Sequence, residues 1–196
     1  MKDDFGTFPM VRSMSEIAGS TAVLIAAECL NNFNNGKGYL LGGVSGVPST
    51  RVVILGAGVV GEFASRTAKG LGANVTVFDN LSRRGTKENI EWLKSMRAEF
   101  EFIQGNIVTD IELLNTSVLN KDIVFHFAAQ VTVTTSVSDP REDFMINAMG
   151  TFNILEALRQ HNRNAVLLYS STNKVYGGLK SVETKIINDK YQFTTM

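Results

Sequence analysis

The fold of this chain is decided by the stretch RVVILGAGVVGEFASRTAKGLGANVTVFD, residues 51–79. Four apolar residues, 52–55, are followed by a glycine-rich loop over 56–61, a segment of helical character, and a second apolar run, 75–78, that ends at Asp79. A strand, a glycine turn, a helix and a second strand in this order are typical of the first half of a dinucleotide-binding domain. Because all the parts occur at about the expected spacing, the pattern predicts more than a glycine loop alone would.

Each glycine of the loop has a separate physical task. Gly56 permits the tight turn out of the strand, and Gly58 allows bare backbone to approach a pyrophosphate. Gly61 allows the helix to pack closely on the strand. The start of the helix, at Val59 and Val60, offers free N–H groups to the phosphates. The loop therefore predicts a binding site for the pyrophosphate of a dinucleotide.

The acidic residue after the second run indicates which dinucleotide is bound. Asp79 stands 18 residues after Gly61, where a carboxylate accepts hydrogen bonds from the ribose hydroxyls of NAD(H). Asn80 follows it and is expected to line the same site. Arg83 and Arg84 are compatible with a 2′-phosphate, but Asp79 would repel that group. The two arginines are therefore also interpreted as part of a solvated loop.

Composition excludes several classes of function. Of the 196 residues 44% are apolar, and 19 basic residues balance 19 acidic ones, so nothing argues for nucleic acid or an anionic membrane as a partner. The acids in residues 1–4 argue against a signal peptide. The longest near-apolar run, 22–27, is far shorter than the ~20 residues of a membrane span. We expect a cytoplasmic protein, with its only cysteine, Cys29, in the core.

The residues before the glycine loop predict a helical arm. Ser13 and Glu16 have the spacing of a capping box, and a helix-compatible segment follows to about Asn31. Residues 31–48 are rich in asparagine and glycine and predict a linker. The apolar stripe expected along the arm comprises Ile17, Ala18, Leu24, Ala27 and Leu30.

After the second strand, helical and strand patterns continue to alternate. We expect a capping box at Thr109 and Glu112, and an N-cap at Asp139 before Pro140. Further elements are expected at 86–97 (helix), 100–104 (strand), 109–118 (helix), 123–127 (strand), 140–160 (helix) and 165–169 (strand). The pattern predicts an α/β fold with a Rossmann-like, doubly wound parallel sheet of five strands in the order 3-2-1-4-5. The predicted division is an arm and linker over 1–48, an NAD-binding domain over 49–178, and a tail over 179–196.

The first part of the chain resembles the family of alanine dehydrogenases and proton-translocating transhydrogenases. The resemblance covers about residues 5–79, and it is carried by the segments 6–9, 14–19, 40–48 and 56–61. It implies that the arm is the helix linking two domains, followed by the first half of the NAD domain. The substrate domain of that family would precede residue 1, so we expect no alanine oxidation.

The rest of the chain resembles a different family, the extended short-chain dehydrogenases that act on nucleotide sugars, and among them the CDP-paratose (tyvelose) 2-epimerases. This resemblance covers about residues 78–190, and it is carried by the segments 78–86, 126–130, 147–157 and 169–177. The two resemblances meet within residues 77–80. We interpret the chain as a chimera; the alternative is one divergent family that shares both sets of motifs.

The second resemblance implies further site residues. NAD would be the cofactor and a nucleotide sugar a possible ligand. Thr172 would position a hydroxyl group of the sugar. The additional cofactor-binding positions implied are Asn106 and Ile107 beside adenine, Ala128, Ala129 and Gln130 along the pocket, and Ser170 near nicotinamide.

The catalytic pair of these epimerases is incomplete in the sequence. They use Tyr-x-x-x-Lys, in which the lysine lowers the tyrosine pKa. Tyr191 is followed at this spacing by Thr195, and Tyr176, which Lys180 follows, stands in a strand-exit context. His126 is interpreted as a packed histidine, and no metal site is expected.

Three functions remain open. The first is an NAD(H)-binding domain without complete catalytic machinery, and the second is a nucleotide-sugar epimerase or dehydratase that needs a further C-terminal part. The third is a fragment derived from alanine dehydrogenase, or a non-enzymatic interaction module whose N-terminal helix also supports homo-oligomers.

Overall fold

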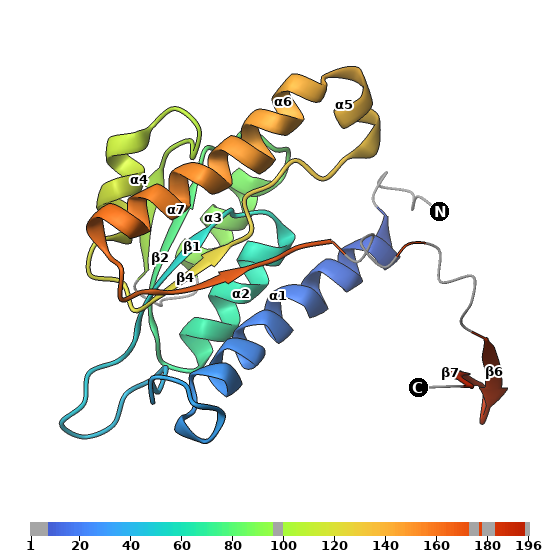
Figure 1. Cartoon of the computed structure of the whole chain (residues 1–196), viewed down its shortest axis with the longest axis horizontal. Coiled ribbons are helices and arrows are strands. Elements are labelled where there is room, and N and C mark those ends of the chain that lie inside the picture. Colours follow the sequence, from blue (N-terminus) through green and yellow to red (C-terminus); the bar gives the residue numbers. More distant parts are fainter. Residues whose placement is uncertain (1–7, 96–99, 173–176, 178–182, 195–196) are drawn as a thin grey trace.

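The computed structural model of the chain describes residues 8–95, 100–172, 177 and 183–194. Its body is a parallel sheet of five strands in the order β3-β2-β1-β4-β5, with helices on both faces (Figure 1). This confirms the predicted fold class and strand order. The strands are β1 (Arg51–Leu55), β2 (Asn74–Asp79), β3 (Glu101–Gln104), β4 (Ile123–His126) and β5 (Val166–Tyr169).

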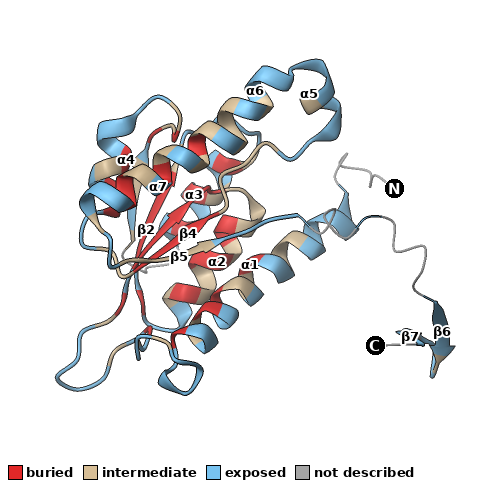
Figure 2. Cartoon of the chain, in the orientation of Figure 1, coloured by how far each residue is buried: buried red, intermediate tan, exposed pale blue. Residues whose placement is uncertain are grey.

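The central strand β1 joins the two parts of the chain that resemble different families. On one side it pairs with β2, where Ile54 lies opposite Val77, and on the other with β4, where Ile54 lies opposite Phe125. Residues 52–55 are completely buried, because helices cover both faces of the sheet (Figure 2). A strand buried on both faces needs a continuous apolar run, which is the pattern of the sequence here.

Two apolar clusters form the core, one on each face. The first contains Val52 and Ile54 together with side chains of α1 (Pro9–Leu30), α2 (Val59–Gly70) and α3 (Thr86–Ser95). The second contains Val53 and Leu55 together with side chains of α4 (Ile111–Val118) and α7 (Gly150–His161). Each cluster combines residues from before and after the junction at 77–80, so the two parts share one core.

The N-terminal helix differs from the prediction in its start. It begins at Pro9, four residues before Ser13, so the predicted capping box at Ser13 and Glu16 is wrong. Proline suits the first turn of a helix because its missing N–H would have no partner there. Glu16 instead forms an ion pair with Arg12, with Nε and Oε1 2.9 Å apart.

The buried face of α1 also differs from the predicted stripe. Its buried residues are Gly19, Val23, Ala26 and Leu30, of which only Leu30 was predicted. Ile17 and Leu24, which the prediction placed on the buried side, are exposed. Cys29 is exposed as well, so its prediction as a core residue is wrong.

Helix ends in the second part of the chain match the predictions unevenly. At Asp139 the predicted N-cap is confirmed, because its carboxylate accepts the N–H of Glu142 at 2.9 Å. Helix α4 begins at Ile111 without a side-chain cap, so the capping box at Thr109 and Glu112 is wrong. Nearby, the Asp110 carboxylate accepts the N–H of Asn106.

Several elements were not predicted. The long helix expected after Asp139 is divided into α6 (Pro140–Phe144), a π-helical turn (Met145–Met149) and α7. The short helix α5 (Val133–Ser138) precedes it. In the expected tail, β6 (Thr184–Ile187) and β7 (Lys190–Phe193) pair with each other as an antiparallel hairpin, drawn apart from the body in Figure 1. The predicted end of the helix at Arg97 lies outside the described residues.

His126 closes β4 and is buried, as predicted for a packed histidine. Its Nε2 lies 2.8 Å from Oγ1 of Thr151 on α7. That hydroxyl donates its only proton to the carbonyl of Asn147, so it accepts a hydrogen bond from Nε2–H of a neutral ring. Nδ1 has no hydrogen-bond partner among the residues that the structure describes, and burial lowers the pKa of His126 to about 4.

Helix α1 packs on α2 with an unusually close backbone approach at Gly19. A Cβ atom at this position would lie 2.2 Å from the carbonyl oxygen of Val60, in the first turn of α2. By length and composition alone, α1 is also long and apolar enough to cross a membrane. One of its faces is nevertheless buried against α2, so this criterion is weak evidence here. Because α2 begins at the glycine loop, the contact between Gly19 and Val60 places the arm directly behind that loop.

The contact at Gly19 predicts an inverted mutational effect. Gly19→Ala is expected to destabilise the protein by about 1–3 kcal/mol, because the new methyl group collides with backbone. In a helix without such a contact, the same change stabilises by about 1 kcal/mol. Gly70→Ala is the matched control, since a Cβ at Gly70 meets nothing within 4 Å. Urea unfolding measures both, and a Gly19→Ala variant as stable as Gly70→Ala would contradict the packing.

The buried histidine predicts a pH dependence of stability. The unfolded chain binds a proton near pH 6.5, whereas folded His126 resists protonation until about pH 4. Its contribution is therefore complete above pH 6.5 and is lost as pH falls toward 4, which costs about 3 kcal/mol. Burial raises the pKa of Glu62, which acts in the opposite direction, so the comparison is between wild type and His126→Gln.

Urea unfolding at several pH values between 4.5 and 7.5 provides the measurement. The free energy of unfolding of the wild type should fall more steeply with acid than that of His126→Gln. Parallel curves for the two proteins would show that the ring titrates normally in the folded state.

Candidate functional site

The three glycines of the loop after β1 are held by different constraints. Gly56 has φ +107°, a conformation that favours glycine, and a Cβ there would lie 2.7 Å from the backbone nitrogen of Ala128. A Cβ at Gly61 would lie 1.8 Å from the carbonyl oxygen of Gly56. A Cβ at Gly58 would meet no atom within 4 Å. Packing of the protein thus explains Gly56 and Gly61, whereas Gly58 leaves open space beside the backbone.

The carboxylate of Asp79 connects the glycine loop to the chain after β2. One oxygen, Oδ2, accepts the N–H of Ala57 at 2.7 Å, and the other, Oδ1, accepts the N–H of Leu81 at 2.6 Å. A carboxylate has about four acceptor positions, so two remain available. Asp79 therefore organises the loops and can still accept hydroxyl groups.

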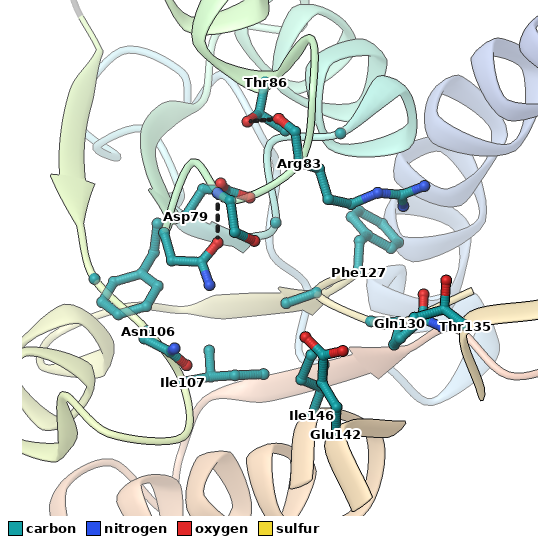
Figure 3. A pocket seen from close by; sticks show the side chains of 18 residues that line it. Asp79, Arg83, Thr86, Asn106, Ile107, Phe127, Gln130, Thr135, Glu142 and Ile146 are labelled. Carbon is teal, nitrogen blue, oxygen red and sulfur yellow. Dashed lines mark hydrogen bonds between the residues drawn. The ribbon is translucent and has the colours of Figure 1, made fainter. Parts of the chain in front are cut away.

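A cavity of about 260 Å³ lies where the loops after β1, β2, β3 and β4 meet (Figure 3). This is the carboxyl edge of the sheet, where ligands of open α/β sheets bind. Ligand pockets commonly measure about 300–1,000 Å³, so the cavity suits part of a dinucleotide. The structure brings together nine of the predicted residues along its wall: Gly56, Gly58, Asp79, Asn80, Asn106, Ile107, Ala128, Ala129 and Gln130.

Five other predicted residues lie outside the wall of this cavity. Val59, Val60 and Gly61 form the first turn of α2, directly after the glycine loop. Ser170 and Thr172 follow β5 and are exposed. The hydroxyl of Ser170 donates to the carbonyl of His126 at 3.2 Å. Tyr176 and Lys180 lie outside the described residues.

The structure adds residues to the site that sequence reasoning missed. Arg83, one of two arginines left open as a solvated loop, lines the cavity, as does Thr86 at the start of α3. Glu142 and Ile146 form the opposite wall from Asp79 (Figure 3). Glu142 was not predicted as a site residue, and no signal in the sequence places it in the pocket. The cavity thus contains two carboxylates and one guanidinium group.

Asn106 contributes to the site through a turn. Its Oδ1 accepts the N–H of Val108 at 2.9 Å, which fixes the loop after β3. This oxygen is the atom expected to accept a hydrogen bond from an N–H of adenine, and its second lone pair remains for that contact.

The loop after β4 is held by an interlocked set of hydrogen bonds. The Asn147 side chain accepts the N–H of Gln130 and donates to the carbonyl of Gln130, each at 2.9 Å. It also donates to Asp143, which accepts from the hydroxyl of Ser136. Asn147 lies in the π-helical turn, a feature frequently found at functional sites. These hydrogen bonds therefore hold Gln130 in the pocket wall of the ligand-free protein.

Known proteins resemble the chain in two different ways. It is 44% identical to CDP-paratose 2-epimerase of Salmonella typhi over 138 residues, 69% of this chain and 40% of that protein. It is 47% identical to alanine dehydrogenase of Staphylococcus epidermidis over 79 residues, 40% of this chain and 21% of that protein. The chain therefore spans less than half the length of either relative. These matches concern different parts of the chain and confirm its mixed character.

Solved structures of both kinds of enzyme are similar to the chain. The UDP-Glc/GlcNAc 4-epimerase of Campylobacter jejuni matches with a TM-score of 0.61 and 29% identity, over 70% of this chain and 42% of that one. The UDP-glucose 4-epimerase of Brucella ovis in complex with NAD matches with a TM-score of 0.53 and 28% identity. This match covers 66% of this chain and 38% of that one. An L-alanine dehydrogenase shares the fold over 98% of this chain and 49% of that one, with a TM-score of 0.56 and 24% identity.

One family profile covers most of the chain. The profile of GDP-mannose 4,6 dehydratase matches residues 53–193, so it starts at β1, upstream of the predicted junction. The cavity at the carboxyl edge of the sheet lies within this range. The chain belongs to the GDP-mannose 4,6 dehydratase family over residues 53–193, and an alanine dehydrogenase-like segment forms its N-terminal part.

Proposed function

We propose that the chain is an NAD(H)-binding unit in which two partial folds of different origin form one cofactor site. The observation that carries the proposal is the open space at Gly58, since packing of the protein does not require a glycine there. A relative of similar fold is described in complex with NAD, which supports the same cofactor.

Each part of NAD finds a suitable group at the site. The N–H groups of Val59 and Val60, at the start of α2, face the pyrophosphate as hydrogen-bond donors. Asp79 accepts the hydroxyls of the adenosine ribose, and Asn80 extends this wall. Asn106 and Ile107 flank adenine.

The nicotinamide half extends past the loop after β4 toward Ser170. Ala128, Ala129 and Gln130 support it from one side, held there by Asn147. NAD bound in this way would supply hydride transfer.

Charge in the pocket favours NAD over NADP. The carboxylates of Asp79 and Glu142 both line the cavity and repel the additional phosphate of NADP. Arg83 is the one cationic side chain on the described wall. Its guanidinium group offsets part of the repulsion between the two carboxylates and the pyrophosphate of NAD.

A second function follows from the family to which residues 53–193 belong. The same site would serve a nucleotide-sugar epimerase or dehydratase, with Thr172 positioning a sugar hydroxyl next to nicotinamide. Because the chain spans 40% of its CDP-paratose 2-epimerase relative, the catalytic tyrosine and lysine would come from a further segment. Turnover of a nucleotide sugar after such a segment is joined to the chain would favour this function.

The proposal predicts that NADH binds and that Gly58 controls the affinity. Gly58→Ala is expected to raise the Kd for NADH at least tenfold, because the new methyl group occupies the space meant for pyrophosphate. The free protein should remain folded and lose at most about 1 kcal/mol of stability, because Gly58 has φ −62°, its Cβ meets no atom within 4 Å, and the only cost is alanine in place of glycine at the N-cap of α2. Gly70→Ala is the matched control and should bind NADH as the wild type does. Isothermal titration calorimetry measures all three, and equal affinities would contradict the proposed site.

A further inference from the structure

The face of α1 that points away from α2 is apolar. We define the outer face of α1 as Met10, Val11, Met14, Ile17, Leu24 and Ile25. These residues are between 49% and 80% exposed. Their spacing places them together on one side of the helix, opposite the buried stripe that contains Gly19 and Val23. A helix that is apolar on both sides normally has a partner on both.

Charged side chains are absent from this face between Met10 and Ile25. The two charged residues within that span, Arg12 and Glu16, lie toward α2 and pair with each other. Thr21 is the one polar residue within the outer face, and it carries no charge. The next charged residue, Glu28, lies one turn beyond its end. An opposing apolar surface could therefore cover the whole face without burying an unpaired charge.

The exposed area is close to what a specific interface requires. With roughly 150–200 Å² for each fully exposed side chain of this size, the outer face presents about 700 Å². A typical dimer buries about 800 Å² on each partner. The largest apolar patch of an ordinary monomer measures only about 300–600 Å².

We propose that the outer face of α1 is a homodimer interface in which two copies of α1 pack antiparallel. The face runs from Met10 to Ile25, so its midpoint lies beside Ile17. In an antiparallel pair centred there, Met10 of one copy meets Leu24 of the other, and Ile17 meets its own equivalent. A two-fold interface needs such a self-complementary patch. A lipid surface fits less well, because interfacial helices carry a rim of free lysine and arginine that this face lacks.

Oligomeric state measured by analytical ultracentrifugation tests the interface. The wild type is expected to dimerise with rising concentration, and Ile17→Glu is expected to be a folded monomer. Leu113→Glu is the matched control, because Leu113 is an exposed apolar residue on α4. This control should remain dimeric. A monomeric wild type, a dimer unaffected by Ile17→Glu, or sedimentation of the wild type with lipid vesicles in place of dimer formation would each overturn the proposal.

Crosslinking tests the antiparallel arrangement separately. Single cysteines are introduced at Ile17 or Leu24 after Cys29→Ser removes the native thiol, and a short bis-maleimide reagent is added. Ile17→Cys should crosslink efficiently, because the two copies of this position face each other. Leu24→Cys should not, since its equivalents would be about 20 Å apart at 1.5 Å per helical residue. Equal crosslinking at both positions would indicate parallel helices and contradict the arrangement.

Discussion

The pairing of β1 with strands on both sides is the constraint on which the rest of the structure depends. Its partner β2 belongs to the same alanine dehydrogenase-like part, whereas β4 comes from the part that resembles nucleotide-sugar enzymes. Ile54 aligns with Val77 on one side and Phe125 on the other, so a single register serves both. If β1 shifted by one residue, its side chains would change faces and both core clusters would be lost. The glycine loop follows β1 directly, so the register of β1 also fixes the position of the loop.

The junction at residues 77–80 can join segments from two families because it lies at the end of β2, where the chain leaves the sheet. Phe78 packs so closely on the loop after β3 that a Cβ at Gly105 would lie 2.6 Å from its ring. Asp79 accepts one N–H from each side of the junction, from Ala57 and from Leu81. At the opposite edge of the sheet, Arg51 at the start of β1 forms two side-chain hydrogen bonds with Asp122, just before β4. These contacts cross between the two parts, so both parts contribute to one sheet and one core.

The sequence was sufficient for the features that depend on neighbouring residues. The buried strands β1, β2 and β4 are short apolar runs, and the alternation of strand and helix patterns along the chain implies the parallel sheet. The glycine loop and Asp79 were predicted as cofactor-binding from their own pattern, whereas the candidates after β3 and β4 were implied by the resemblance to nucleotide-sugar enzymes. The structure places both groups at the carboxyl edge of the sheet. The N-cap at Asp139 is likewise a local feature.

Features that depend on distant partners could not be predicted in this way. Which stripe of α1 is buried is decided by its contact with α2 at Gly19, so Ile17 and Leu24 were assigned to the wrong side. Glu142 enters the pocket because the π-helical turn and the hydrogen bonds of Asn147 set the position of α6, and none of these has a simple sequence pattern. Whether Arg83 faces solvent or the cavity likewise depends on the path of the loop after β2.

The central claim is that residues from both parts of the chain form one NAD site. A titration of the ¹⁵N-labelled protein with NADH, followed by NMR of the backbone amides, tests it directly. The account predicts that the amides of Gly58 and Val59 shift together with those of Ala128 and Gln130, with one common Kd. Shifts confined to the glycine loop, or no saturable shifts in a folded protein, would contradict a shared site.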